Sequence, residues 1–233
     1  MRVIRTRYGA RVVDGQSFLS KVLWAPGPTD EVFDVLAAAI AAAPAGPVAV
    51  LGFAGGGMIA PLRAMGDDRP IDAVDLDVGA EPLFRELCGD WCGTVRVHRG
   101  EATRWLGRQR ARFAAIADDL SIEAADGATK PRASLEAVPG RVAARLRAGG
   151  WAVVNLLPVA RVAWADLIDR AAGAHAEVRV VHLRDHDNRV VVAGARLPGA
   201  RALSNAFRAR LASIGSSQAR KIAVRSVRQN TSR

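Results

Sequence analysis

The sequence is poor in cysteine and has no apolar run long enough to cross a membrane. Its two cysteines, Cys88 and Cys92, are too few for a disulfide framework in a chain of 233 residues, and no cluster of histidines and cysteines completes a metal site. The first residues also lack the apolar segment of a secretory signal. We therefore expect a cytoplasmic protein with reduced thiols, no metal and no membrane partner.

Acidic residues are absent from the last part of the chain. Residues 199–233 contain eight basic side chains and no Asp or Glu, so they hold most of the formal net charge of +10. A basic tail can bind nucleic acid or another polyanion. Arginine, however, greatly outnumbers lysine in the whole chain, a pattern that coding bias also produces. Nucleic acid is therefore the less favoured partner of this tail, and we expect residues 221–233 to be mobile, or ordered only against a partner.

The clearest positive signal is an apolar run, Val48 to Leu51, that leads into three glycines and a helical pattern over 59–65. A second expected strand, 71–77, ends in acids about twenty residues further on, as in nucleotide-binding βαβ units. Glycines allow a tight turn close to a ligand, and an acid at the next strand end can accept the hydroxyls of a ribose. The predicted nucleotide-binding residues here are Ala54, Gly55, Gly56, Gly57, Asp75 and Asp77.

Strand-like and helical patterns alternate five times between residues 48 and 171. Two further strands, 177–183 and 190–197, are joined by a turn too short for a crossover helix and must be antiparallel. This order predicts an α/β fold with a mostly parallel, Rossmann-type sheet of seven strands and one antiparallel strand near the C-terminus. Further expectations are a loop over 120–131, one helix over 134–147 and a helix over 201–211.

The chain divides into three expected parts. Residues 1–24 contain short β-patterns interrupted by glycines and predict a hairpin-like extension. Residues 25–198 form the α/β domain, and residues 199–233 form a basic helix and tail. The extension has more apolar surface than an isolated hairpin can bury, which predicts either a homodimer interface or a lid over the protein's own site.

Ligands of open parallel sheets bind beyond the carboxyl ends of the strands. Two more strand ends contribute polar or glycine residues there, namely Gly100 and Glu101 after the third strand and Asp118 and Asp119 after the fourth. Acids that meet in one crevice favour a ligand that is cationic or rich in hydroxyls. The alternative is that each acid is solvated or caps the next helix.

With these motifs, the segment from Val48 to Pro158 resembles the catalytic domain of spermidine synthases, within the S-adenosylmethionine-dependent methyltransferase superfamily. The resemblance implies a methyltransferase-like fold and S-adenosylmethionine or its decarboxylated form as co-substrate. It implies that Asp75 binds the ribose and that Glu101 lies beside the adenine. The catalytic aspartate of the family matches Asp119, or Asp118 if the register shifts by one, and would take or orient the proton of an acceptor amine.

Three positions depart from these families. Gly57 stands where spermidine synthases have an aspartate in the glycine loop, and Ile122 where they have a second aspartate after the catalytic one. Gly52 stands where methyltransferases often have an acid that holds the methionine amine. Three functions therefore stay open: aminopropyl transfer to a small amine or other cationic acceptor, methyl transfer, and nucleotide binding without catalysis.

Overall fold

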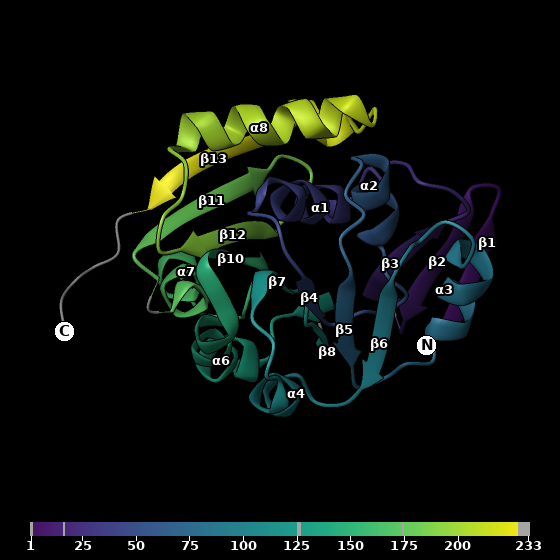
Figure 1. Cartoon of the computed structure of the whole chain (residues 1–233), viewed down its shortest axis with the longest axis horizontal. Helices are drawn as coiled ribbons and strands as arrows, with labels where there is room; N and C mark the ends of the chain where they lie inside the picture. Colours follow the sequence, from purple (N-terminus) through teal and green to yellow (C-terminus); the bar gives the residue numbers. More distant parts are fainter. Residues whose placement is uncertain (1, 16, 125–126, 174, 228–233) are drawn as a thin grey trace.

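The computed structural model describes residues 2–15, 17–124, 127–173 and 175–227 (Figure 1). Its centre is an eight-stranded sheet. The order of strands across this sheet is β13 (Ile222–Val227), β11 (Glu177–Leu183), β12 (Arg189–Gly194), β10 (Leu146–Leu156), β7 (Phe113–Asp118), β4 (Val48–Leu51), β5 (Ile71–Asp75) and β6 (Val95–Arg99).

Neighbouring strands from β10 to β6 pair in parallel, whereas β12 pairs antiparallel with both β10 and β11. The predicted α/β fold, with a mostly parallel sheet and an antiparallel strand near the C-terminus, is confirmed. The antiparallel pair arises because the turn between β11 and β12 has no room for a helix that would return the chain.

The sheet has one strand more than the sequence analysis expected, because β13 pairs antiparallel with β11. The expectation of a mobile segment was wrong for residues 222–227. Ile222 is buried and Val224 packs against the core, so apolar residues alternate with polar ones as in a half-buried strand. The interleaved arginine and serine hid this short pattern. Arg228 and Arg233 of the predicted basic tail lie outside the described residues.

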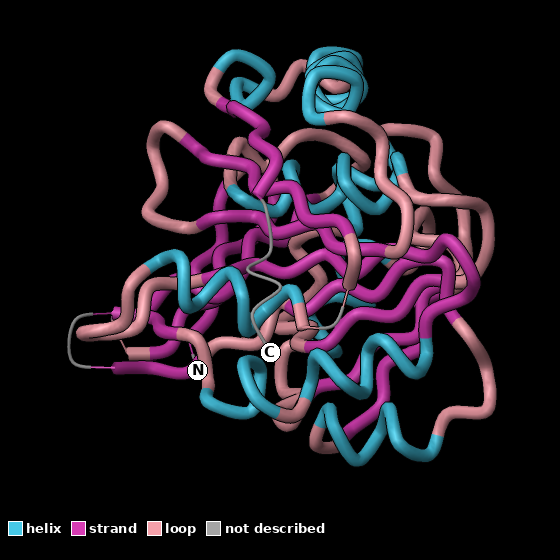
Figure 2. Tube along the Cα trace, turned by 90° about the vertical axis from the view of Figure 1, so that its left-hand side faces the viewer, coloured by secondary structure: helices cyan, strands magenta, loops and turns pink. Residues whose placement is uncertain are grey.

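Helices cover both faces of the sheet (Figures 1 and 2). One hydrophobic cluster joins the sheet to α1 (Val32–Ala42), α2 (Ile59–Ala64), α3 (Glu81–Cys88) and α8 (Ala200–Ser213). A second cluster joins the other face to α4 (Ala102–Arg108), α5 (Arg132–Glu136), α6 (Val138–Arg145) and α7 (Trp164–Ala172). Within the described ranges, no helix is long and apolar enough to cross a membrane.

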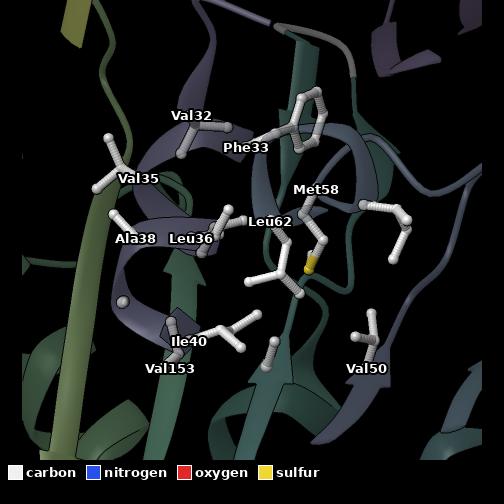
Figure 3. Close-up of a cluster of buried hydrophobic side chains, with 14 of the residues drawn as sticks. Val32, Phe33, Val35, Leu36, Ala38, Ile40, Val50, Met58, Leu62 and Val153 are labelled. Atoms are coloured by element: carbon white, nitrogen blue, oxygen red, sulfur yellow. The ribbon is translucent and has the colours of Figure 1, made fainter. Parts of the chain in front are cut away.

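The core under α1 holds the glycine loop in place. Figure 3 shows Leu36 and Ile40 of α1 packed with Leu62 of α2 above Val50 of β4 and Val153 of β10. All five side chains are at most 1% exposed. Full burial of such a side chain contributes about 1.5–3 kcal/mol. The β4–α2 connection, which contains the glycines, is therefore fixed at both of its ends.

The N-terminal segment forms a separate three-stranded antiparallel sheet of β1 (Arg2–Thr6), β2 (Gly9–Asp14) and β3 (Ser17–Leu23). Its inner side packs through Val12 and Val22 onto the core cluster. The Trp91 indole after α3 also donates a hydrogen bond of 2.8 Å to the carbonyl of Trp24. Val3 and Ile4 on β1 stay 40% exposed, and the homodimer inferred from the sequence stays a prediction.

Two expectations about the segment after β7 were wrong. The expected loop contains a short hairpin of β8 (Ile122–Ala124) and β9 (Gly127–Thr129). The single helix expected over 134–147 is divided into α5 and α6, and β10 already begins at Leu146. Pro139 lies in the first turn of α6, where its missing N–H costs nothing, and so marks a helix start. This segment lies beside the carboxyl ends of β4 and β7.

Candidate active site

The carboxyl ends of β4, β5, β6 and β7 open into a cavity of about 450 Å³, which we call the large cavity. Residues of β2, β3 and the β8–β9 hairpin also line this cavity. Six of the residues proposed from sequence line it together, although they are far apart in the chain: Ala54, Asp75, Asp77, Gly100, Glu101 and Asp119. The expected meeting of strand ends is therefore present in the fold.

Asp75, at the end of β5, organises the neighbouring glycine loop. Its Oδ2 accepts hydrogen bonds from the backbone amides of Phe53 and Ala54, at 2.6 and 2.9 Å, and its Oδ1 accepts one from the amide of Asp77. A carboxylate has about four acceptor sites. Three are used, so about one remains for a ligand hydroxyl.

The three glycines of the loop face the protein and do not line the large cavity. A Cβ on Gly56 would lie 2.8 Å from the Phe53 ring, and one on Gly57 would lie 2.7 Å from the Ser20 hydroxyl. A Cβ on Gly55 would lie 3.2 Å from the Val22 side chain. Ala54 instead lines the cavity, in a left-handed conformation with φ of 41°. The glycines thus allow the loop to pack closely, and Ala54 is the loop residue that faces a ligand.

Gly52 explains why no acid can follow β4 here. Its φ is +84°, and a Cβ would lie 2.8 Å from the carbonyl oxygen and 2.9 Å from the carbonyl carbon of Asp119. Any side chain would therefore push away the backbone that carries the candidate catalytic residue. The departure at Gly52 follows from this close approach of two chain segments.

We expect Gly52→Ala to lower the free energy of unfolding by more than the ~1–3 kcal/mol of backbone strain alone. Gly66→Ala is the matched control, because Gly66 has a φ of +78° but no atom within 4 Å of its Cβ position. Urea denaturation measures both variants. Equal destabilisation of the two variants would contradict the close contact with Asp119.

Two of the strand-end acids also hold local backbone. Glu101 caps α4, with hydrogen bonds from the amides of Thr103 and Arg104 at 2.8 and 2.7 Å and from the Thr103 hydroxyl. Burial raises the pKa of Glu101, but these hydrogen bonds outweigh it and the pKa lies below its ordinary value. Asp77 accepts from the amide of Gly79. The alternative role that the sequence left open, helix and turn capping, is therefore present beside any ligand contact.

Asp119 differs from the other strand-end acids because it combines a carboxylate oxygen that has no partner among the described residues with a strongly raised pKa. Its Oδ1 accepts a hydrogen bond of 2.7 Å from the amide of Asn155, which in turn accepts one of 2.8 Å from Asn188. Its Oδ2 has no hydrogen-bond partner among the described residues. Burial raises the pKa of Asp119 to about 7, assisted by the nearby charges of Asp118 and Asp75 and opposed by Asn155 and Lys130.

Asp118 lies inside the protein and does not line the large cavity. Its Oδ1 lies 2.8 Å from Nζ of Lys130, whose side chain is fully buried. Lys130 also donates to the carbonyls of Asp118 and Leu120, at 3.2 and 3.0 Å. Of the two catalytic candidates, the structure brings only Asp119 to the cavity, and Asp118 anchors the chain that follows it.

A second cavity, of about 420 Å³, adjoins the large one, and we call it the middle cavity. Asp119, Ala54 and Leu19 line both. Asn155 from β10 and the acids Glu31, Asp185 and Asp187 also line the middle cavity. Asp119 thus lies at the junction of two spaces, as a group that acts between two ligands must.

Sequence reasoning missed several cavity residues. Leu76 and Ile122 line the large cavity with 67% and 53% of their surface exposed, which is unusual for large apolar side chains. Asn155 and Asn188 were missed because single asparagines carry no motif. The position of Leu76 between two strand-end acids was a usable signal, since an apolar residue at a strand end faces the ligand space.

Several solved structures have a similar fold. Human methyltransferase-like protein 13 in complex with SAH aligns with a TM-score of 0.63 and 16% identity, over 79% of this chain and 92% of that one. Spermidine synthase from Thermotoga maritima aligns with a TM-score of 0.61 and 11% identity, over 91% of this chain and 73% of that one. A spermidine synthase in complex with the transition state analogue AdoDATO aligns with a TM-score of 0.61 and 10% identity, again over 91% of this chain and 73% of that one. At these identities the similarity shows the fold, which is methyltransferase-like. No protein-family model matches the sequence, and no curated protein has a significantly similar sequence.

Proposed function

We propose that this chain transfers an aminopropyl group from decarboxylated S-adenosylmethionine to an amine. The observation that carries the proposal is the charge of the large cavity. Among the described residues that line it there are six acids and no Lys, Arg or His: Asp14, Asp75, Asp77, Glu101, Asp119 and Glu123. The decarboxylated donor carries a sulfonium and an ammonium, both positive. The intact donor adds a carboxylate, which no side chain of this lining would balance.

The adenosyl end of such a donor also fits the large cavity. Asp75 has an acceptor site left for a ribose hydroxyl. Gly100, which directly follows β6, lines the cavity without a side chain that would fill it. Leu76 and Ile122 offer apolar surface that an adenine ring would cover. The fold shared with a spermidine synthase and a methyltransferase supports this placement.

The chemistry asks little of the protein beyond position and one proton acceptor. The sulfonium supplies an activated carbon, to which the amine nitrogen bonds while the carbon–sulfur bond breaks and its electron pair goes to sulfur. Holding the two reactants in line supplies most of the acceleration. The free Oδ2 of Asp119 accepts a hydrogen bond from the amine and takes the proton that the new carbon–nitrogen bond releases. A pKa of about 7 leaves a large share of Asp119 ready to accept it at neutral pH.

We expect the protein to bind decarboxylated S-adenosylmethionine more tightly than S-adenosylmethionine, because the intact donor adds a carboxylate to an acidic cavity. Methylthioadenosine, which has neither the ammonium nor the carboxylate, reports binding of the adenosyl part alone. Calorimetric titration measures the three affinities. Product analysis with each donor and a mixture of amines then identifies the reaction. Aminopropyl transfer releases methylthioadenosine, whereas methyl transfer releases S-adenosylhomocysteine.

The other outcomes of these binding and product measurements would each support a different function. Tighter binding of the intact donor, with release of S-adenosylhomocysteine, would replace this proposal by methyl transfer. Binding of methylthioadenosine without any product would favour a non-catalytic module, which the absent acids at Gly57 and Ile122 also motivate. No binding of the three ligands at millimolar concentration would reject the adenosyl site altogether.

A further inference from the structure

A third cavity, of about 310 Å³, lies at the turn between β11 and β12, and we call it the hairpin cavity. It shares Pro158, His186, Asp187 and Asn188 with the middle cavity. The middle cavity in turn shares Asp119 with the large one. The three cavities therefore adjoin in a row that leads from the large cavity, past Asp119, to the β11–β12 turn.

The far end of this row holds Arg189, the only Lys or Arg among the described residues that line the three cavities. Arg189 on β12 and His182 on β11 are cross-strand partners, and the Arg189 guanidinium carbon lies 4.3 Å from the centroid of the Trp164 ring. Burial and the charges of Arg189 and Arg225 lower the pKa of His182, so its ring is neutral near pH 7. A neutral ring can accept a hydrogen bond, and its Nδ1 lies 2.5 Å from Nη1 of Arg189.

Most of the hydrogen-bonding capacity of Arg189 is unused. A guanidinium has five N–H donors, but in the described part of the chain Arg189 bonds only to His182, and its Nε is buried without a partner. No Asp or Glu among the described residues forms an ion pair with Arg189, although Asp187 lines the same cavity. A partly buried cation without an anion is costly, and a bound anion would remove that cost.

The neighbours of Arg189 also prepare it for an anion. The contact with the Trp164 ring restrains the guanidinium, and a guanidinium can donate two parallel hydrogen bonds to the oxygens of a carboxylate or phosphate. The nearby Asp185 is already paired with Lys221 at 2.6 Å, which removes one competing negative charge from the path. The hairpin cavity thus combines an open volume, an oriented cation and an aromatic wall.

We propose that the acceptor is an amine joined by a chain to an anionic group, a carboxylate or a phosphate, with the amine at Asp119 and the anion at Arg189. This inference rests on the proposed function and narrows its substrate class. A diamine would place a second positive charge next to Arg189, so simple diamines are the poorer acceptors.

The test compares matched ligands. ω-Amino carboxylates and aminoalkyl phosphates of increasing chain length are titrated calorimetrically against diamines of the same lengths, with and without methylthioadenosine. We expect an amino carboxylate or amino phosphate of suitable length to bind at least about tenfold more tightly than the diamine of that length. Equal or tighter binding of the diamines would overturn the inference, as would no binding of either anionic series.

Arg189→Gln identifies the group that holds the anion. It should weaken binding of the anionic series at least about tenfold and leave the diamines unchanged or improved. Arg184→Gln is the matched control, because Arg184 is exposed on the same turn and does not line the cavity. If Arg189→Gln does not fold, Trp164→Leu, which removes the stacking partner, should weaken the same series. Undiminished affinity in the folded variant would overturn the role of Arg189.

The two proposals fail separately. Affinity for methylthioadenosine reports the adenosyl site, which contains neither Arg189 nor Trp164. If methylthioadenosine binds but the anionic series does not, the acceptor inference fails and the proposed donor site stands. If the anionic series binds without methylthioadenosine ever binding, the proposed transfer fails and the anion site stands.

Discussion

Replacing Asp119 with asparagine is expected to reduce the rate of transfer by about 10²–10⁴-fold, the range usual for loss of a general base. Asparagine keeps the size of the side chain and can still bond to Asn155, but it cannot take the proton of the acceptor amine. Steady-state kinetics with saturating donor measure the loss. Asp169→Asn, which changes an exposed acid on α7 outside all three cavities, is the control. Full activity of Asp119→Asn would remove Asp119 from the mechanism.

The same variant should be more stable than the wild type at alkaline pH. Asp119 has a pKa of about 7 when folded and about 3.9 when unfolded. The folded state therefore binds more protons between these values. The contribution of Asp119 to stability is complete below about pH 4 and is lost as pH rises through 7. Above pH 7 the buried charge costs on the order of a few kcal/mol, which asparagine avoids.

Thermal melts at about pH 8 and pH 5 test this sign. A gain of ~1 kcal/mol corresponds to about 2–4 °C in a chain of this size, and the gain should be larger at the higher pH. A variant that melts at a lower temperature than the wild type at about pH 8 would show that folding does not raise the pKa of Asp119. Lower activity together with higher stability would mark Asp119 as a residue kept for function at a cost in stability.

Lys130→Met is expected to lower the free energy of unfolding by about 3–5 kcal/mol, because it leaves the carboxylate of Asp118 buried without its counter-charge. The side chains of Lys130 and Asp118 are 0% and 3% exposed, so water cannot replace the lost partner. Arg132→Met is the matched control. Arg132 forms an exposed pair with Glu136 at a similar distance, 2.7 Å, and such pairs contribute about 0.3–0.5 kcal/mol.

Urea denaturation of Lys130→Met, Asp118→Asn and the double variant forms a cycle that isolates the coupling of the pair. The double variant should recover part of the loss, since no buried charge remains in it. Similar losses in Lys130→Met and Arg132→Met would contradict the buried pair. A large coupling would show that Asp118 serves to hold the segment between β7 and α5, to which Asp119 and Leu120 belong.

The sequence predicted the parts of this fold that depend on local pattern. Continuous apolar runs such as Phe113–Ala117 become buried parallel strands because both faces of the sheet are covered. Strand ends meet on one side because parallel strands share a direction, and so Asp75, Gly100 and Asp119 could be placed together before the structure was known.

Tertiary contacts decided what the sequence could not predict. The glycine loop lies between β4 and α2 as predicted, but which of its residues faces the cavity depends on packing against Phe53, Ser20 and Val22. Whether Asp118 or Asp119 faces the cavity depends on Lys130, twelve residues beyond Asp118. The place of Arg189 in the hairpin cavity is invisible in sequence, since Trp164 and Arg189 meet only when α7 packs beside β12.

The pairing of β13 with β11 has a consequence for how this chain is made. A ribosome produces β11 well before residues 222–227, so the outer edge of β11 has free N–H and C=O groups during that interval. A free strand edge is a template for pairing with another chain. Until Ile222 to Val227 emerge and occupy it, a nascent chain is exposed to edge-to-edge aggregation. The last described strand of this protein therefore covers the edge of β11 only once its own synthesis is complete.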